Sequence, residues 1–302
     1  YGVIVQFVFY VNLLTWPFAS VGWVTSLVMK AEASMTRILE FLNRESRVSN
    51  GDTTLGPIDK IEFKNVHFTY PETQINAISN FNCTVLAGET VAFIGATGSG
   101  KSSIVQLLTR MYLSNQGSIL INGIPMESLD EKSYREKIRV VPQDVFLFSD
   151  SILNNVKFGK QDATAEEVEK ACKMADLHST IMEFPDKYET LLGERGINLS
   201  GGQKQRLSIA RALIGNPEIL ILDDCLSAVD TQTEEHILEA IKAVRFGKTN
   251  IIVSHRISGI QHANQIHVIQ EGTTIESGTH SELINRKGEY ARLFQQQQVQ
   301  PN

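Results

Sequence analysis

The segment at residues 95–102 reads Gly95-Ala96-Thr97-Gly98-Ser99-Gly100-Lys101-Ser102. It follows a short apolar run at residues 90–94, expected to be a strand, and it leads into an expected helix over 102–111. This setting is typical of a P-loop, whose glycines let backbone N–H groups and the helix amino terminus face phosphate groups. Lys101 is expected to neutralise the β- and γ-phosphates, and the Ser102 hydroxyl to bind Mg²⁺. We predict nucleotide contacts from these eight residues and from the adjoining Ser103.

A second apolar run, Ile219 to Leu222, ends in the acidic pair Asp223 and Asp224. A carboxylate at the end of a buried strand is costly unless a cation lies beside it. We therefore expect Asp223 to bind Mg²⁺ through water, and Asp224 to orient or deprotonate an attacking water molecule. The alternative is that the two acids only cap the end of a strand.

The segment Ser200-Gly201-Gly202-Gln203 precedes an expected helix over 204–214. Free N–H groups at a helix amino terminus, together with the helix dipole, form an anion site. Because the P-loop leaves no obvious use for a second anion site in the same chain, we predict that this site faces the γ-phosphate of ATP held by another subunit. The alternative is an ordinary helix cap with a glycine turn.

The first 29 residues contain no charged side chain. At about 1.5 Å per residue, a helix of this length reaches roughly 43 Å, which exceeds the ~30 Å hydrocarbon core of a membrane. Lys30, Arg37, Arg44 and Arg47 follow, and the positive-inside rule then places the rest of the chain in the cytoplasm. We expect a membrane helix with a cytosolic extension at 1–42, a linker at 43–59, and a chain that is the carboxyl-terminal piece of a membrane protein. A buried helix of a soluble core is the alternative.

Composition excludes some classes of function. A chain of 302 residues with 42% hydrophobic residues can hold one large domain and an appendage. The net charge of −6 argues against a nucleic-acid partner, which normally requires a basic surplus. Cys83, Cys172 and Cys225 are widely spaced without a CxxC pair, so we expect neither a disulfide framework nor a zinc site, but small apolar residues in a reducing cytosolic setting.

In this order the motifs resemble the nucleotide-binding domain of ATP-binding cassette (ABC) transporters, and the similarity covers essentially the whole chain. The resemblance implies ATP and Mg²⁺ as cofactors and an α/β P-loop NTPase (RecA-like) fold with an antiparallel β subdomain and a helical subdomain. It implies that Tyr70 stacks on adenine, that Gln143 links the metal and the attacking water to the membrane part, and that His255 contacts the γ-phosphate. Asp230, in Ser227-Ala228-Val229-Asp230, matches the D-loop and is expected to contribute to the nucleotide site.

One motif narrows the class to exporters. The segment Leu192-Gly193-Glu194-Arg195-Gly196 resembles the segment that exporters place between the nucleotide domain and the intracellular loops of the membrane domain. Residues 1–42 are similar to the last membrane helix of such half-transporters, and Phe146-Leu147-Phe148 would supply an apolar surface for a coupling helix. The resemblance implies a nucleotide-binding domain over 60–295, with a helical subdomain at about 144–215, and a disordered tail at 296–302.

The chain departs from the family pattern at two adjacent positions. Asp224 stands where the family has glutamate, and Cys225 stands where it has proline. Aspartate is one methylene shorter, so its carboxylate lies roughly 1.5 Å farther back, and a misplaced general base forfeits much of its contribution of roughly 10²- to 10⁴-fold. We predict a site that holds ATP well and hydrolyses it slowly, as in the weakened subunit of a heterodimeric bacterial multidrug-type exporter. A homodimer with two slow sites is the rival, and the retained His255 keeps it open.

Two further hypotheses assign the chain a function other than driving export. A soluble cassette ATPase acting on ribosomes or DNA is disfavoured by the charge-free segment at 1–29, by Gly193-Glu194-Arg195-Gly196 and by the acidic balance. A nucleotide-holding subunit that only completes its partner's site differs from the leading interpretation in degree. The expected partners are a second half-transporter, the membrane and an exported substrate that the sequence leaves open, with hydrophobic or amphipathic compounds expected from the exporter class.

Overall fold

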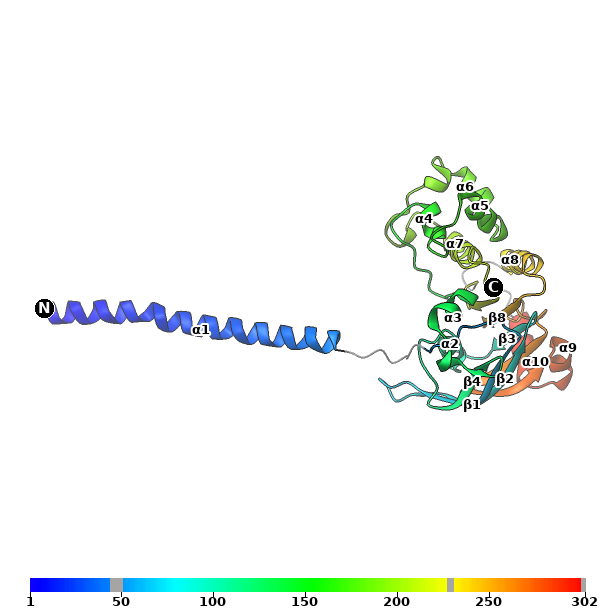
Figure 1. Ribbon diagram of the computed structural model, residues 1–302, viewed down its shortest axis with the longest axis horizontal. Coiled ribbons are helices and arrows are strands. Elements are labelled where there is room, and N and C mark those ends of the chain that lie inside the picture. The colour runs from blue at the N-terminus through cyan, green and yellow to red at the C-terminus, as the bar shows by residue number, and fades with distance from the viewer. Residues whose placement is uncertain (44–50, 227–230, 300–302) are drawn as a thin grey trace. The chain divides into compact units, whose positions relative to one another are not determined.

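The computed structural model describes residues 1–43, 51–226 and 231–299 of the chain (Figure 1). It divides into two units, Tyr1–Arg47 and Val48–Asn302. The first unit is the helix α1, Gly2–Leu42, which passes through Pro17 without interruption. It is long and apolar enough to cross a membrane, and none of its most apolar window is buried against protein. The hydroxyls of Thr15 and Thr25 donate to carbonyls one turn earlier in α1, which satisfies polar groups as an apolar environment requires. The apolar helix predicted at the amino end is therefore confirmed.

The second unit contains a small antiparallel sheet with strand order β2-β1-β4-β5. Its strands are β1 (Lys60–Thr69), β2 (Asn76–Leu86), β4 (Gln116–Ile121) and β5 (Ile124–Pro125). Along β1 the side chains of Ile61, Phe63, Val66 and Phe68 are buried, so the spacing of two residues lengthens to three after Phe63. The pairing register shifts at that point, and Asn65 has a positive φ of 48°. A β-bulge therefore keeps both halves of the apolar pattern on the core face.

A larger sheet has the strand order β10-β9-β3-β8-β7-β6 and is parallel except for β10. Its strands are β3 (Thr90–Ile94), β6 (Ile138–Val141), β7 (Ile219–Asp223), β8 (Thr249–Ser254), β9 (Gln265–Gln270) and β10 (Thr273–Gly278). The helix α2, Lys101–Leu108, buries Ile104, Leu107 and Leu108 in a core shared by strands of both sheets. Nearly continuous apolar runs such as β7 follow from this burial, because layers cover both faces of the larger sheet. The helices α3 (Glu131–Lys137) and α8 (Thr231–Val244) complete this part.

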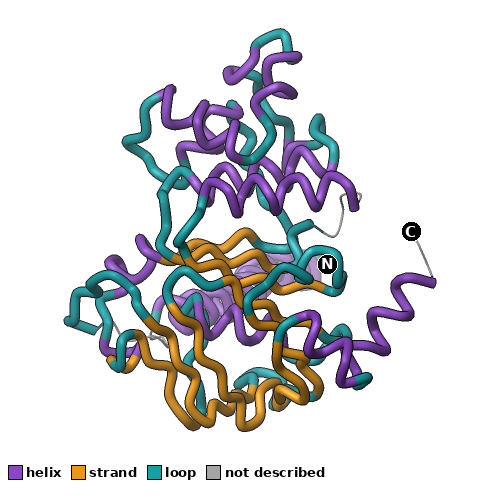
Figure 2. The backbone as a smooth tube through the Cα atoms, turned by 90° about the vertical axis from the view of Figure 1, so that its right-hand side faces the viewer, coloured by secondary structure: helices purple, strands orange, loops and turns teal. Residues whose placement is uncertain are grey.

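Four further helices form a separate group beside the sheets (Figures 1 and 2). They are α4 (Ile152–Lys157), α5 (Ala165–Met174), α6 (His178–Glu183) and α7 (Gly201–Leu213), and they share a second hydrophobic core. Residues 163–183 have a helical sequence pattern throughout, but the chain breaks between α5 and α6. Asp176 has a positive φ of 52°, which a right-handed helix does not accommodate. The helices otherwise fall within the expected helical subdomain.

The carboxyl-terminal helices α9 (His280–Arg286) and α10 (Glu289–Val299) form a third core with β3 and β9. The predicted disordered tail from 296 needs correction, because α10 continues to Val299. Its end is held by side-chain hydrogen bonds of Gln297, which are described below. Leu55 and Ile58, in the segment expected to be a linker, are buried in the first core. The three cysteines are buried, as expected of small apolar residues, and each is free.

Candidate nucleotide site

The predicted P-loop joins the end of β3 to the start of α2, the strand–loop–helix setting that the motif requires. Gly100 has a φ of +105°, and a Cβ at this position would lie 2.5 Å from the carbonyl oxygen of Ala77. A Cβ on Gly95 would lie 2.1 Å from the carbonyl oxygen of Ile269. Only glycine fits at both ends of the loop, because a side chain would collide with fixed backbone atoms.

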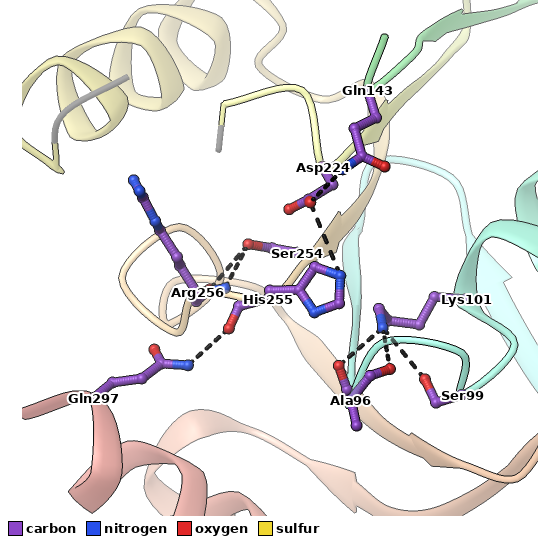
Figure 3. A network of polar contacts seen from close by, with 10 residues as sticks. Ala96, Ser99, Lys101, Gln143, Asp224, Ser254, His255, Arg256 and Gln297 are labelled. Carbon is purple, nitrogen blue, oxygen red and sulfur yellow. Dashed lines mark hydrogen bonds and ion pairs between the residues drawn. The ribbon is translucent and has the colours of Figure 1, made fainter. Parts of the chain in front are cut away.

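Lys101 lies inside the loop with only 4% of its surface exposed. Its Nζ donates to the carbonyl oxygens of Gly95 and Ala96, both at 2.8 Å, and to Ser99 Oγ at 3.2 Å (Figure 3). Burial lowers the pKa of Lys101 to about 8, and the charges of Asp224 and Asp223 partly oppose this. Because the folded pKa lies below the unfolded one, the charged lysine costs stability below about pH 8, and this cost is relieved as the pH rises from about 8 to the unfolded pKa. A phosphate group would instead favour the charged form.

Asp223 ends β7 with one carboxylate oxygen, Oδ1, buried and lacking a hydrogen-bond partner among the described residues. Burial is the main cause that raises the pKa of Asp223 to about 6, and the charge of Asp224 adds to it. The charge of Lys101 acts in the opposite direction. A divalent cation would supply the missing partner for this oxygen. Ser102 is exposed at the start of α2, as a hydroxyl ligand would have to be. These residues fit Mg²⁺ bound together with phosphate oxygens.

Asp224 lies beside two other predicted site residues, Gln143 and His255 (Figure 3). Its Oδ2 accepts a hydrogen bond from Gln143 Nε2 at 3.3 Å and lies 3.9 Å from His255 Nε2. The strands β6, β7 and β8 are adjacent and parallel, so their carboxyl ends lie at one edge of the sheet. Gln143, Asp224 and His255 each follow one of these ends and therefore lie close together. Since Gln143 turns its Nε2 toward Asp224, its Oε1 is the atom left for a metal ion.

The backbone at Asp224 is unusual. Its φ is +46°, a left-handed conformation that aspartate tolerates better than most residues, and its N–H donates to the carbonyl oxygen of Val253 at 2.8 Å. The side chain is 9% exposed. Backbone and burial together fix where this short carboxylate can reach.

The segment Ser200–Gln203 begins α7 in the helical subdomain. Ser200 Oγ accepts from the N–H of Gln203 at 3.3 Å, and Gln203 Oε1 accepts from the N–H of Ser200 at 2.8 Å. This capping box uses both side chains and leaves the N–H groups of Gly201 and Gly202 for an anion. Within the described part of the chain, no hydrogen bond or ion pair joins this segment to the P-loop, Asp223 or His255.

The side chains of Tyr70 and Ser103, two of the predicted nucleotide contacts, bond to each other. The Tyr70 hydroxyl hydrogen-bonds to Ser103 Oγ at 2.9 Å and donates to Gln106 Oε1 at 2.7 Å, while its ring packs edge-on against Phe68 and Tyr112. The Ser103 side chain is buried, so we expect only its backbone to be offered to phosphate. Tyr70 is thereby fixed beside α2, and its stacking on adenine stays a prediction. Asp230 and its D-loop neighbours lie outside the described residues.

The aromatic segment after Gln143 is only partly the surface that was expected. Phe146 and Phe148 are exposed, but Leu147 between them is buried in the second core. A groove of about 600 Å³ is lined by Phe146, Phe148 and a third exposed ring, Phe158, which sequence reasoning missed. The guanidinium of Arg211 lies 5.7 Å from the ring centres of Phe148 and Phe158 and donates to the Phe146 carbonyl oxygen.

Sequence reasoning also missed Gln297, which contacts the backbone on both sides of Arg256 (Figure 3). Nothing in a run of four glutamines distinguishes this residue. Glu234 was missed as well. It is buried, and its Oε2 lies 3.4 Å from Arg256 Nη1. Burial raises the pKa of Glu234, and the charge of Arg256 partly opposes this rise.

Comparison with known proteins gives consistent matches. The family model described as "ABC transporter" matches residues 78–227. The uncharacterized ABC transporter ATP-binding protein YknU of Bacillus subtilis (strain 168) is 44% identical over 296 residues, which are 97% of this chain and 51% of that protein. The probable multidrug resistance ABC transporter ATP-binding/permease protein YheI of the same organism is 41% identical over 99% of this chain and 51% of its own length. A solved structure, a bacterial Atm1-family ABC exporter with ATP bound, matches with a TM-score of 0.85 and 35% identity, covering 92% of this chain and 49% of that one. The chain spans about half the length of the curated relatives it matches.

Proposed function

Because this chain contains an ATP-binding domain of the ABC transporter family, we propose that it supplies the energy for an exporter half-transporter. In such a half-transporter α1 would lie in the membrane, the nucleotide-binding domain would lie in the cytoplasm, and ATP bound at the P-loop would hold two such domains together. Closure of the two domains reorients the membrane helices, and hydrolysis with product release resets them. ATP is the substrate, and Mg²⁺ would neutralise charge on its phosphates.

One observation carries the proposal. The P-loop, Gln143, Asp224 and His255 meet at one edge of the larger sheet, whereas the amide-rich start of α7 makes no hydrogen bond or ion pair with them among the described residues. One chain thus offers two complementary halves of a phosphate site that it does not join. A second subunit that lends its own Ser-Gly-Gly segment to this P-loop, and receives this one in return, uses both halves.

The second subunit we propose is a different chain with glutamate at the position of Asp224. Asp224 is about one C–C bond short of the family glutamate, roughly 1.5 Å, and its buried, left-handed backbone gives it little freedom to compensate. Lys101, Ser102 and Asp223 are present for binding ATP. This chain would therefore hold ATP in a slow site and complete the competent site of its partner, while a homodimer with two slow sites is the rival.

Measuring ATP hydrolysis separates these two assemblies. We expect the purified full-length protein to hydrolyse Mg-ATP slowly on its own, and at least about tenfold faster when co-expressed with its partner subunit, because the general base then comes from the partner. Gly202→Asp, which blocks the anion site at α7, should abolish that stimulation. Robust turnover by the protein alone that Asp224→Asn abolishes would contradict the heterodimer.

The proposed cargo is a hydrophobic or amphipathic compound. YheI, named a probable multidrug resistance transporter, is 41% identical to this chain, and the relative MdlA of Escherichia coli (strain K12), named multidrug resistance-like, is 39% identical. Nucleic acid is not among the proposed partners, since the chain is acidic. The soluble-ATPase alternative accounts for neither α1 nor the match to an exporter structure.

The aromatic groove is the proposed docking surface for the intracellular loops of the membrane domain. Phe146→Asp is expected to lower transport of an amphipathic fluorescent dye into inverted vesicles about tenfold or more, because a charge would replace an aromatic anchor in the groove. ATP binding should be unchanged. Phe246→Asp is the matched control, since Phe246 is 93% exposed and lies outside the groove. Equal transport by the two variants would remove the groove from the coupling route.

A further inference from the structure

The helix α10 connects the two loops that the proposed function assigns to the phosphates of ATP. Near its start, Glu289 and Arg292 line a cavity of about 330 Å³ together with the P-loop residues 95–99. Tyr290 is fully buried in the third core, which also contains Ile94 at the end of β3 and Ile257 just after His255. The helix is therefore anchored rather than frayed along its first turns.

Gln297, near the end of α10, forms hydrogen bonds through both the nitrogen and the oxygen of its side-chain amide to the loop that carries His255 (Figure 3). Its Nε2 donates to the carbonyl oxygen of His255 at 2.7 Å, and its Oε1 accepts from the N–H of Ile257 at 2.8 Å. A planar amide that bonds to two backbone groups restricts rotation as well as distance. The contact joins positions 40 and 42 residues apart in the sequence.

Other contacts restrain the same loop: Arg256 Nη1 lies 3.4 Å from Glu234 Oε2, and Ile257 is buried in the third core. Ser254 Oγ accepts from the N–H of Arg256 at 2.9 Å, which closes a tight turn after β8. The His255 side chain is 39% exposed, and its Nε2 is 3.9 Å from Asp224 Oδ2, too far for a direct hydrogen bond. The position of the imidazole therefore depends on the backbone that carries it, and Gln297 bonds directly to the carbonyl of His255 itself.

We propose that Gln297 is a positioning residue: by fixing the backbone at His255 and Ile257, it holds the His255 imidazole where the γ-phosphate of bound ATP can contact it. The inference rests on the proposed function, in which His255 reads the γ-phosphate. Gln297 touches no nucleotide itself. Its loss should weaken retention of ATP and spare ADP, which has no γ-phosphate.

The test uses the full-length protein with its partner and measures photolabelling of this subunit by azido-ATP and azido-ADP. Gln297→Ala is expected to weaken ATP binding about fivefold, the effect of losing about one net hydrogen bond, and to leave ADP binding unchanged. Gln297→Glu should weaken ATP binding as well, because a carboxylate can accept from Ile257 but cannot donate to the His255 carbonyl. Gln296→Ala is the matched control: Gln296 is exposed on the same helix and makes no side-chain hydrogen bond to the part of the chain described.

A double-mutant cycle separates positioning from a purely structural role. If Gln297 acts through His255, adding Gln297→Ala to His255→Ala causes no further loss of ATP binding. Equal weakening of ATP and ADP, additive losses in the cycle, or Gln297→Ala behaving like Gln296→Ala would overturn the inference. Undiminished ATP labelling of Lys101→Ala would instead overturn the proposed function, so the two failures are distinguishable.

Discussion

Lys101→Ala is expected to reduce ATP binding at this site at least about 100-fold. The lysine is almost fully enclosed by the P-loop, and its ammonium is the cation that the loop offers to phosphate. Removing one partner of such an enclosed charge pair costs about 3–5 kcal/mol, which corresponds to a loss of that size. Isothermal titration with Mg-ATP, or photolabelling of the subunit, measures it directly.

The fold should survive this substitution. Burial lowers the pKa of Lys101 to about 8, so at neutral pH the charged side chain opposes folding rather than supporting it. We therefore expect the melting temperature of Lys101→Ala to equal or exceed that of the unmodified protein. Lys248→Ala is a suitable control, because Lys248 also donates to a loop carbonyl, that of Asn216, away from the site. Loss of ATP binding in both variants would point to a general defect and not to a P-loop.

Much of the site could be predicted because its residues belong to local patterns. The P-loop depends on two glycines whose positions admit no side chain, and the acidic pair depends on an apolar run that ends at a sheet edge. Neither pattern alone brings Gln143, Asp224 and His255 together. The resemblance to a family supplied that expectation, and the parallel order β8-β7-β6 explains it physically.

The features that escaped prediction depend on contacts between distant parts of the chain. Gln297 bonds to backbone atoms, which carry no sequence signal, and it lies in a run of identical residues. Leu147 belongs to an apolar triplet whose period could not show which member faces the core. The break between α5 and α6 depends on one backbone angle, the positive φ of Asp176. The sequence does not reveal this angle, because aspartate also occurs within helices.

Two contacts of Asp224 bear on its proposed role as a weakened general base. The Gln143 amide donates to Oδ2, and His255 lies on the same side, so the carboxylate faces the two other residues proposed to act in hydrolysis. In the proposed mechanism the carboxylate is therefore already oriented, and the length of its side chain is what limits it. A longer carboxylate on the same backbone would supply it, at a small cost in stability, because glutamate accepts a positive φ less readily than aspartate does.

Asp224→Glu is accordingly expected to raise ATP turnover at this site about 10- to 100-fold, within the range that a well-placed general base contributes. The measurement is phosphate release by the full-length complex in which the partner's own P-loop lysine is replaced, so that only this chain's site turns over. Asp224→Asn, which matches the size of the natural side chain without its charge, should lower turnover below that of the unmodified protein. ATP affinity should be similar in all three, because Lys101, Ser102 and Asp223 are unchanged. If Asp224→Glu left turnover unchanged while ATP still bound, the missing methylene would not be what makes this site slow, and the proposal of a site weakened at its general base would fail.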